Sequence, residues 1–409
     1  MTEAATDRHV VIVGASLAGT RTAQGLRAQG HTGPITLVGA EAELPYDRPP
    51  LSKKLLQGEW SESSVDGIRL ATRAELEELG IELRLGTAAA DLDPQARLVR
   101  LADGTTVRYD VLVIATGAAA RPSPWLPESG VHQLRTLDDA RAIAARLALG
   151  EPVVVVGGGF IGTEIAAAAS GRGCAVTVVD PVPEPMARLV GPEIAGSLVE
   201  LHRRNGVQTR FGVGVVGIEG KAGDLTVELD SGERLAASTA VVGIGSVPST
   251  GWLAGSGLKL DNGVVTDRFL RAIGFDDVYA VGDVARWPHP GHGTDVRAEH
   301  WTNAGDQARY VATAVTQGAA AGYEPTDYVW SDQYDWKVNA FGRRDPAGHS
   351  VVVGDLQADG RVAVVHADAS GAACGAVTVN WIRALNQARR LLAAGASAED
   401  VVEAIRQLP

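Results

Sequence analysis

The sequence predicts an α/β protein that contains two similar parallel-sheet domains and a smaller α+β domain at its carboxyl end. Three observations predict this fold class. An apolar run, a glycine-rich loop and a helix-like segment occupy residues 10–30, and the same order recurs at residues 153–173, which marks an internal repeat. From about residue 325 onward, short alternating strands and two helical stretches replace that pattern, as expected for a separate domain.

The first repeat begins with the apolar run Val10–Val13, which is typical of a strand buried on both faces. A second apolar run, Ile35–Val38, completes a β-α-β unit. The loop between the first strand and the helix, residues 14–19 (GASLAG), fits the G-x-G-x-x-G frame with Ser16 at the second glycine. Because such a loop lets backbone N–H groups approach a pyrophosphate, it predicts a Rossmann-like dinucleotide site. An ordinary tight turn is the structural alternative.

The second repeat fits the same frame in full. Val153–Val156 precedes the loop 157–162 (GGGFIG), offset by 143 residues from its counterpart, and a strand follows at residues 176–179. Asp180 ends that strand, where a carboxylate accepts hydrogen bonds from ribose hydroxyls and repels a 2′-phosphate. No Lys or Arg occurs in PVPE, residues 181–184. We therefore predict NADH rather than NADPH as the ligand; an acid that merely ends a strand is the alternative.

Both repeats continue into antiparallel strands. Turns are expected at Asp103-Gly104 in the first repeat and at Ser231-Gly232 in the second. A buried strand at residues 111–117 (VLVIATG) ends in small residues, as required where the backbone passes close to a cofactor. Another, 279–283 (YAVGD), places Asp283 at a strand end, where ligands bind in doubly wound sheets; a helix cap is the alternative. A helix is expected from about residue 303 to 317.

Charge and composition exclude several classes of protein. The 409 residues carry a formal net charge of −12, which disfavours nucleic acid because phosphate neutralisation needs a basic face. No apolar stretch reaches the roughly 18 to 20 residues that a membrane span needs. The start, MTEAATDRH, lacks the basic and apolar regions of a secretory signal. We therefore expect a cytoplasmic protein with no membrane or nucleic-acid partner.

The cysteines and histidines indicate neither a disulfide nor a metal. Cys174 and Cys374 lie 200 positions apart in apolar runs, so both are interpreted as buried small residues rather than as a redox pair. His289 and His292 (HPGH) have no further ligands at metal spacing, which favours a surface loop over a zinc site.

Eight segments together resemble the FAD- and NADH-dependent ferredoxin reductases of bacterial oxygenase systems. In order they are VVIVGASLAG, RPPLSK, VIATGA, VVGGGFIGTE, VVGIGSVP, VYAVGDVA, EHWTNA and WSDQY. The resemblance covers roughly residues 10–392, and RPPLSK and WSDQY are its narrowest motifs. It implies two glutathione-reductase-like domains: a discontinuous FAD-binding domain (7–116 and 246–324) and an NADH-binding domain (117–245). The C-terminal α+β domain (325–409) would contribute to the flavin environment and to partner docking.

The resemblance also implies the residues that contact each cofactor. The family more often has Gly and Asp at the positions of Ser16, Gly39 and Ala40 in this sequence. The resemblance therefore implies the contacts to adenosine least directly. For FAD the implied residues are Gly14, Ser16, Ala18, Gly19, Ala40, Glu41, Arg48, Lys53, Ala89, Ala115, Thr116, Gly117, Arg135, Gly282, Asp283, Glu299, His300, Trp301 and Trp330. For NADH they are Gly157, Gly159, Phe160, Ile161, Gly162, Glu164, Asp180, Gly243, Ile244 and Gly245.

Lys53 and Glu164 are the implied catalytic residues. Glu164 follows Gly162 by two positions, in the expected first helical turn, and in the family this Glu pairs with the Lys of PPLSK near the flavin. The resemblance thus implies that Lys53 stabilises negative charge on the reduced flavin and that Glu164 holds Lys53. A favourable helix dipole for Glu164 and a solvated Lys53 are the alternatives.

The loop at residues 41–48 (EAELPYDR), near the expected flavin, contains no sulfur, so electrons would leave the flavin directly. The resemblance favours a [2Fe-2S] ferredoxin as acceptor, which would serve a haem-thiolate monooxygenase or a ring-hydroxylating dioxygenase. An NADH oxidase or quinone reductase, and an FAD-binding interaction protein of the apoptosis-inducing-factor type, are the alternatives. The candidates for docking the ferredoxin are Arg309, Trp330, Lys337, Arg343 and Arg344. The alternative is a solvated surface charge for each cation and ordinary packing for Trp330.

Overall fold

The computed structural model describes residues 6–58, 60–319, 321–325 and 327–409. The chain divides into two compact units. Unit 1 contains Met1–Asp47, Glu62–Ala119 and Ser246–Thr326, and unit 2 contains Arg48–Ser61, Ala120–Gly245 and Asp327–Pro409. Each unit is built around a parallel sheet, which confirms the predicted α/β class.

The sheet of unit 1 has five parallel strands in the order β19-β7-β1-β2-β3. Its side chains alternate between two cores: Val10 and Ile12 face one, and Val11 and Val13 face the other. Helices pack on one face and antiparallel strands on the other, which is why the central strands are apolar at nearly every position, whereas the edge strand at Ile81–Arg84 also contains Glu82 and Arg84. The strands are β1 (Val10–Val13), β2 (Ile35–Val38), β3 (Ile81–Arg84), β7 (Val111–Ile114) and β19 (Val278–Ala280).

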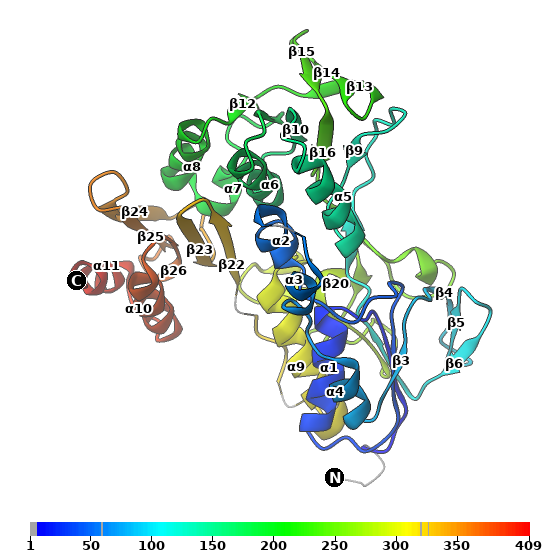
Figure 1. The fold of residues 1–409 in the computed structure, drawn as a ribbon. Helices are drawn as coiled ribbons and strands as arrows, with labels where there is room; N and C mark the ends of the chain where they lie inside the picture. Colours follow the sequence, from blue (N-terminus) through cyan, green and yellow to red (C-terminus); the bar gives the residue numbers. More distant parts are fainter. Residues whose placement is uncertain (1–5, 59, 320, 326) are drawn as a thin grey trace. The chain divides into compact units, whose positions relative to one another are not determined.

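Helices α1 (Leu17–Ala28) and α9 (Trp301–Gln317) lie side by side against this sheet, as Figure 1 shows. The meander β4 (Ala89–Asp93), β5 (Leu98–Leu101) and β6 (Thr106–Arg108) packs on the opposite core, with the expected turn at Asp103-Gly104. Shorter elements complete the unit. They are α3 (Glu62–Asp66), α4 (Arg73–Glu78), β8 (Ala118–Ala120), β17 (Ser246–Pro248), η3 (Gly251–Leu253), β18 (Val264–Val265), η4 (Gly282–Val284), β20 (Ala285–His289) and β21 (Thr294–Val296).

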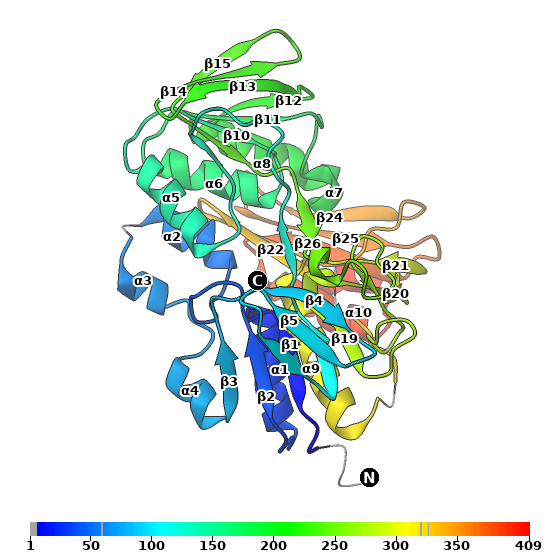
Figure 2. The same cartoon turned by 90° about the vertical axis from the view of Figure 1, so that its right-hand side faces the viewer.

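Unit 2 repeats the parallel arrangement in the order β12-β11-β10-β16-β9. Figure 2 shows α5 (Leu137–Leu147) and α6 (Phe160–Gly171) on one face and the meander β13–β15 on the other. The remaining strands are β9 (Val131–His132), β10 (Val153–Val156), β11 (Val176–Asp180), β12 (Gln208–Phe211), β13 (Val215–Lys221), β14 (Asp224–Leu229), β15 (Arg234–Ala237) and β16 (Thr239–Val242).

The carboxyl-terminal part of unit 2 is an antiparallel sheet, β22-β23-β26-β25-β24. One face packs on α7 (Ala187–Val190) and α8 (Pro192–Arg204), and the other on α10 (Ile382–Ala393) and α11 (Ala398–Arg406). The sequence predicted three of its strands and both final helices. The strands are β22 (Tyr328–Gln333), β23 (Trp336–Gly342), β24 (His349–Asp355), β25 (Arg361–Ala367) and β26 (Ala373–Val379).

The segment 48–61 leaves unit 1 and packs within unit 2. It contains η2 (Pro49–Leu51) and α2 (Lys54–Gln57), and Leu56 is buried in the core formed by α5 and α6. The guanidinium of Arg172 donates to the Gly58 carbonyl at 2.7 Å. These contacts attach to unit 2 a segment that lies inside the range 7–116 expected for the FAD-binding domain. The division into three domains stays a prediction.

Across the described ranges, no helix has both the length and the apolar character required to cross a bilayer.

Candidate functional site

The first glycine loop is packed too tightly for side chains at the first and last glycine positions of its G-x-G-x-x-G motif. Gly14 has φ +122°, and a Cβ there would lie 2.1 Å from the Ala115 carbonyl oxygen. A Cβ on Gly19 would lie 1.8 Å from the Gly14 oxygen. Ser16 is the N-cap of α1, but within the described chain its side chain makes no capping hydrogen bond and the first turn has no acid. The N–H groups of this turn are therefore available to an anion, and the loop fits a pyrophosphate.

The buried amide side chain of Gln307 lies beside this loop. The backbone N–H of Gly282 donates to Oε1 of Gln307 at 2.7 Å, and a Cβ on Gly282 would lie 3.1 Å from that of Ala18. Among the described residues, Nε2 of Gln307 and Nδ2 of Asn303 have no hydrogen-bond partner although both side chains are buried. Two such donors suit a bound polar group. Asp283 follows in the turn η4 rather than at a helix cap.

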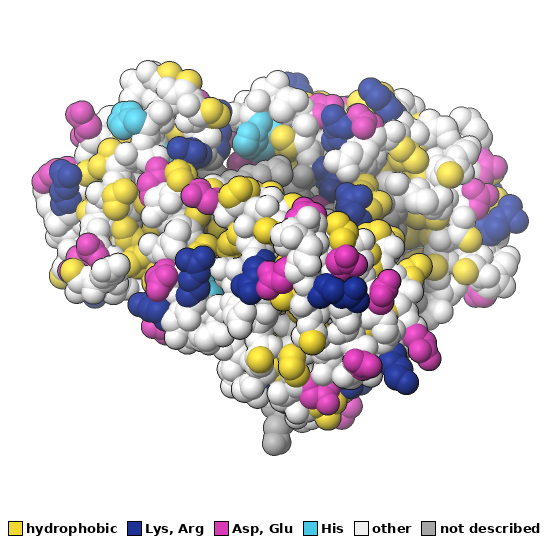
Figure 3. All heavy atoms as spheres, turned by 90° about the horizontal axis from the view of Figure 1, so that it is seen from above, with side chains coloured by type: hydrophobic (Ala, Val, Ile, Leu, Met, Phe, Trp, Pro, Cys, Tyr) yellow, Lys and Arg dark blue, Asp and Glu magenta, His cyan; other side chains and the backbone are white. Residues whose placement is uncertain are grey.

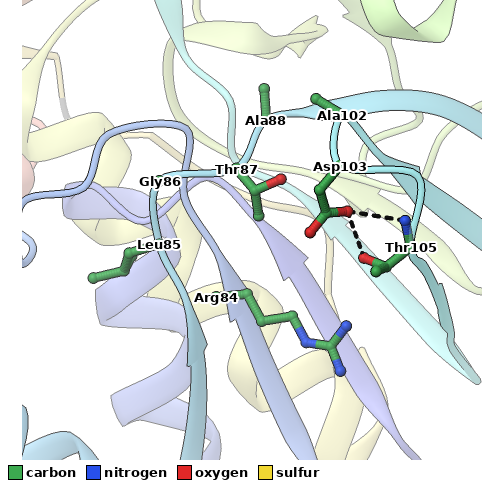
Figure 4. A pocket seen from close by; sticks show the side chains of 8 residues that line it. All are labelled: Arg84, Leu85, Gly86, Thr87, Ala88, Ala102, Asp103 and Thr105. Atoms are coloured by element: carbon green, nitrogen blue, oxygen red, sulfur yellow. Dashed lines mark hydrogen bonds between the residues drawn. The ribbon is translucent and has the colours of Figure 1, made fainter.

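The adenosine side of the predicted FAD site adjoins a hollow of about 520 Å³ (Figure 4). The backbone N–H groups of Gly86 and Thr87 donate to the carbonyls of Glu41 and Gly39, which places the hollow next to the end of β2. The carboxylate of Glu41 accepts the hydroxyl of Tyr46. Ala40 follows Gly39 in the same turn, and Ala89 starts β4 directly after the lining residues. The lining residues are Arg84, Leu85, Gly86, Thr87, Ala88, Ala102, Asp103 and Thr105.

Other predicted FAD contacts of unit 1 lie at strand and helix ends. Trp301 begins α9 after His300 and donates from Nε1 to Asp47 at 2.5 Å. Glu299 pairs with Arg297 at 2.7 Å. Thr116, between Ala115 and Gly117 after β7, donates to the Ser249 carbonyl at 3.0 Å.

The second glycine loop has the same geometry as the first. Gly157 has φ +115°, and a Cβ there would lie 2.2 Å from the Gly243 oxygen. A Cβ on Gly162 would lie 2.0 Å from the Gly157 oxygen. Gly159 is the N-cap of α6, so no side chain covers the helix N-terminus. This loop also fits a pyrophosphate, and Ile244 and Gly245 continue from Gly243 at the end of β16.

The carboxylate of Asp180 is fixed by two backbone groups. Its Oδ2 accepts the Gly158 N–H at 2.7 Å, and its Oδ1 accepts the Val182 N–H at 2.8 Å. A carboxylate accepts about four hydrogen bonds, so further acceptor capacity remains on both oxygens. The side chain can therefore accept further hydrogen bonds, as a contact to ribose hydroxyls requires; that Asp180 binds NADH stays a prediction.

Lys53 and Glu164 form a partly buried ion pair within unit 2. The Lys53 Nζ lies 2.9 Å from Oε1 of Glu164, and the side chains are 15% and 3% exposed. Glu164 also accepts the hydroxyls of Ser52 and Ser331. Ser52 and Ser331 lie within the motifs RPPLSK and WSDQY, but neither was predicted as a partner of Glu164, because a serine hydroxyl carries no signal of its own. One expectation is corrected: α6 begins at Phe160, so Glu164 is its fifth residue and lies beyond the first turn.

The other predicted FAD and NADH contacts of unit 2 lie in separate segments. Arg48 donates from Nη1 to the Arg135 carbonyl at 2.5 Å. Trp330 stacks on Tyr328 with ring centroids 5.9 Å apart. Phe160 packs on the core of the carboxyl-terminal sheet, whereas Ile161 is half exposed. That these residues share one site with the glycine loop of unit 1 stays a prediction.

The cysteines have the environments of structural residues. Cys174 is buried as predicted, whereas Cys374 is only half-buried. Burial raises the pKa of both thiols. His289 differs from expectation: it ends β20 and is buried, with Nδ1 accepting the N–H groups of Gly291 and His292. Only His292 has the exposed position expected of a surface loop.

The docking candidates differ in exposure. Arg309, in unit 1, is 73% exposed and pairs with Asp306 at 3.0 Å. In unit 2, Lys337 and Arg344 are exposed and Arg343 is half-buried. On the face drawn in Figure 3, basic and acidic side chains are interspersed. A shared docking surface for these residues stays a prediction.

Two parallel sheets, each with a pyrophosphate-type glycine loop after a central strand, define an oxidoreductase that binds two dinucleotides. The chain belongs to the pyridine nucleotide-disulphide oxidoreductase family, whose model matches residues 8–308, and a Reductase C-terminal model matches residues 328–404. This membership implies an enzyme that uses FAD and NAD(H).

Similar proteins are named as reductases, and one of them is a component of a dioxygenase system. The chain is 38% identical to the rhodocoxin reductase of Rhodococcus erythropolis, over 94% of this chain and 89% of that protein. It is 40% identical to the ferredoxin–NAD(+) reductase component of the anthranilate 1,2-dioxygenase system from Burkholderia cepacia, over 94% of each chain. The crystal structure of the covalent putidaredoxin reductase–putidaredoxin complex matches with a TM-score of 0.89, at 31% identity, over 98% of this chain and 99% of that one.

Proposed function

We propose that the protein is an NADH:ferredoxin reductase that passes single electrons to a [2Fe-2S] ferredoxin. The observation that carries this proposal is the buried Lys53–Glu164 pair in a family member whose loop 41–48 contains no cysteine. The similar reductases of dioxygenase systems and the putidaredoxin complex support the class of partner. The ferredoxin would serve a haem-thiolate monooxygenase or a ring-hydroxylating dioxygenase.

When bound, FAD accepts two electrons from NADH as a hydride and can release electrons one at a time. The protein contributes binding and charge. Loop 14–19 and the N-terminus of α1 would hold the pyrophosphate of FAD, and loop 157–162 and Asp180 would hold NADH. Lys53 would keep a positive charge beside the flavin, and Glu164 would fix the position of that charge without transferring a proton.

The partner must be guided by local charge rather than by net charge. The chain carries a net charge of −12, and ferredoxins of these systems are generally acidic, so overall attraction is not expected. We propose that Arg309, together with Lys337, Arg343 and Arg344, supplies the cations, and that Trp330 lies near the docking surface. A cytoplasmic location is part of the proposal, which cell fractionation tests.

An anaerobic NADH titration followed by visible spectroscopy, with and without candidate [2Fe-2S] ferredoxins, tests the proposal. NADH should bleach the flavin, and added ferredoxin should be reduced with two equivalents per NADH. Rapid NADH consumption in air without ferredoxin would instead favour an oxidase or quinone reductase. Very slow flavin reduction would favour a non-catalytic FAD-binding protein.

A further inference from the structure

The strand β22 contains two polar side chains that are fully buried. Ser331 and Gln333 are both 0% exposed. Because side chains alternate along a strand, they share one face of β22, and Asp332 lies on the other. Burying polar groups costs free energy unless they are hydrogen-bonded. The hydrogen-bond partners of Ser331 and Gln333 therefore indicate the role of this face of β22.

Both side chains lead to the helix that carries Glu164. Gln333 donates from Nε2 to the hydroxyl of Thr163 at 2.9 Å and to that of Ser331 at 3.1 Å. The hydroxyl of Ser331 donates to Oε1 of Glu164 at 2.5 Å, the same oxygen that Lys53 contacts. The polar face of β22 is therefore joined to the ion pair.

The hydrogen bonds continue on the other side of Gln333. Its Oε1 lies 2.8 Å from Nε2 of His202, which is buried on α8. The hydroxyl of Tyr334 lies 3.2 Å from Nδ1 of the same ring. Five side chains from β22, the turn after it, α8 and α6 thus form one connected line, from Tyr334 to Glu164.

The donors and acceptors of the hydrogen bonds from Gln333 to Glu164 follow from the groups involved. Because Nε2 of Gln333 donates to two hydroxyls, Oε1 is the acceptor, and Nε2 of His202 must carry a hydrogen. In the neutral ring with hydrogen on Nε2, Nδ1 accepts the hydroxyl of Tyr334. Burial lowers the pKa of His202 and raises the pKa of Tyr334 to about 12, in agreement with both assignments. From Tyr334 onward, each side chain in this line donates a hydrogen bond to the next one, and the last bond is accepted by the carboxylate of Glu164.

We propose that Ser331, Gln333 and His202 are positioning residues that hold Glu164 in the orientation in which it binds Lys53. A proton relay is a poor interpretation of the line, because the amide of Gln333 does not pass a proton from one neighbour to the next. The proposal rests on the role proposed above for Lys53 and Glu164. It assigns a function to the motif WSDQY beyond Trp330: the strand that ends at Gln333 orients the ion pair.

The first test is the hydrogen-bond direction itself, which ¹⁵N NMR of the histidine rings reports in the oxidised holoenzyme. The signals of His202 are assigned by their loss in His202→Phe. We expect the neutral form with hydrogen on Nε2, and a change in the Nε2 shift in Gln333→Met. A charged ring, or hydrogen on Nδ1, would overturn the proposed line regardless of any catalytic result.

The second test is the rate of flavin reduction by NADH in anaerobic stopped flow. Ser331→Ala removes a hydrogen bond to a charged group and should slow reduction about tenfold, and Gln333→Met should slow it less. Asp332→Asn, on the opposite face of β22, is the matched control and should leave the rate unchanged. Thermal unfolding of each variant verifies that it is folded.

The midpoint potential of bound FAD gives a third readout. A displaced Lys53 should make the potential more negative in Ser331→Ala, in the same direction as in Lys53→Met. If Lys53→Met slows reduction but folded Ser331→Ala and Gln333→Met do not, the positioning proposal is wrong and the proposed function stands. If Lys53→Met itself has no effect, the role of the ion pair is wrong.

Discussion

Lys53 Nζ lies 2.9 Å from Oε1 of Glu164, although the two residues are far apart in the sequence. The pair is formed inside unit 2, because the segment 48–61 packs on α5 and on α6, the helix that carries Glu164. Glu164 is almost fully buried, so its charge needs the lysine and the two serine hydroxyls as partners.

Replacing Lys53 should impair electron entry while FAD stays bound. In Lys53→Met the fixed positive charge beside the flavin is lost, so flavin reduction by NADH should slow by about 10²-fold, as for loss of one preorganised electrostatic group. Anaerobic stopped flow measures the rate, and the visible spectrum measures the FAD content. Lys54→Met, at the first residue of α2, is the control. An unchanged rate would remove the proposed role.

The two glycine loops should be separable by mutation. Gly157→Ala combines a positive φ with a clash against the Gly243 oxygen, and such strain of roughly 1–3 kcal/mol should weaken NADH binding by about fivefold or more. FAD content should remain normal. The same change at Gly14 should instead lower FAD content.

Gly196→Ala is the control for both loop variants. It lies inside α8, and a Cβ there meets nothing within 4 Å, so the change should raise stability by about 0.5–1 kcal/mol. Isothermal titration with NADH and flavin absorbance are the measurements. Loss of FAD in the Gly157 variant would contradict the assignment of the loops.

Nucleotide preference should depend on Asp180. Its carboxylate is already oriented by Gly158 and Val182 and would repel a 2′-phosphate. Asp180→Ser should therefore weaken the preference for NADH: the kcat/KM for NADH divided by the kcat/KM for NADPH should fall about tenfold or more. Steady-state kinetics with both nucleotides measure it, and a wild-type enzyme that uses NADPH equally well would refute the prediction.

Arg309 should affect the partner and not the nucleotide. Arg309→Glu reverses a highly exposed charge, so turnover with ferredoxin should fall several-fold at low salt and the difference should shrink at high salt. NADH reduction of ferricyanide should be unchanged. Arg73→Glu makes the same charge change on α4 of unit 1, where Arg73 is 57% exposed, and should leave both activities intact. Equal loss of both in the Arg309 variant would argue against docking.

The cysteines should be dispensable. Burial raises the pKa of both thiols, so little thiolate is present near neutral pH and alkylation by iodoacetamide should be slow. The double variant Cys174→Ala, Cys374→Ala should keep turnover with ferredoxin within about twofold, provided that it stays folded. If the folded double variant lost its turnover with ferredoxin, the prediction would be wrong and a thiol would be implicated in electron transfer.

The sequence predicted the central parallel strands because strands buried on both faces are continuously apolar, as Val10–Val13 and Val153–Val156 are. It did not predict the edge strands β3 and β12, in which polar residues interrupt the apolar run. It missed β22 and β23. In β22 the buried face is polar, since Ser331 and Gln333 point inward, so the apolar alternation that marks a strand is absent. The partners of the ion pair were missed for the same reason: buried polar contacts depend on tertiary placement, which periodicity does not reveal.

The boundaries of the two units have a consequence for dissecting the protein. The chain passes from one unit to the other at residues 47/48, 61/62, 119/120, 245/246 and 326/327. No single cut therefore releases an intact unit, and a fragment limited to 120–245 would contain Glu164 without its lysine. A buried carboxylate without its counterion disfavours folding. Unit 2 therefore depends on residues 48–61, which lie in the sequence between two segments of unit 1.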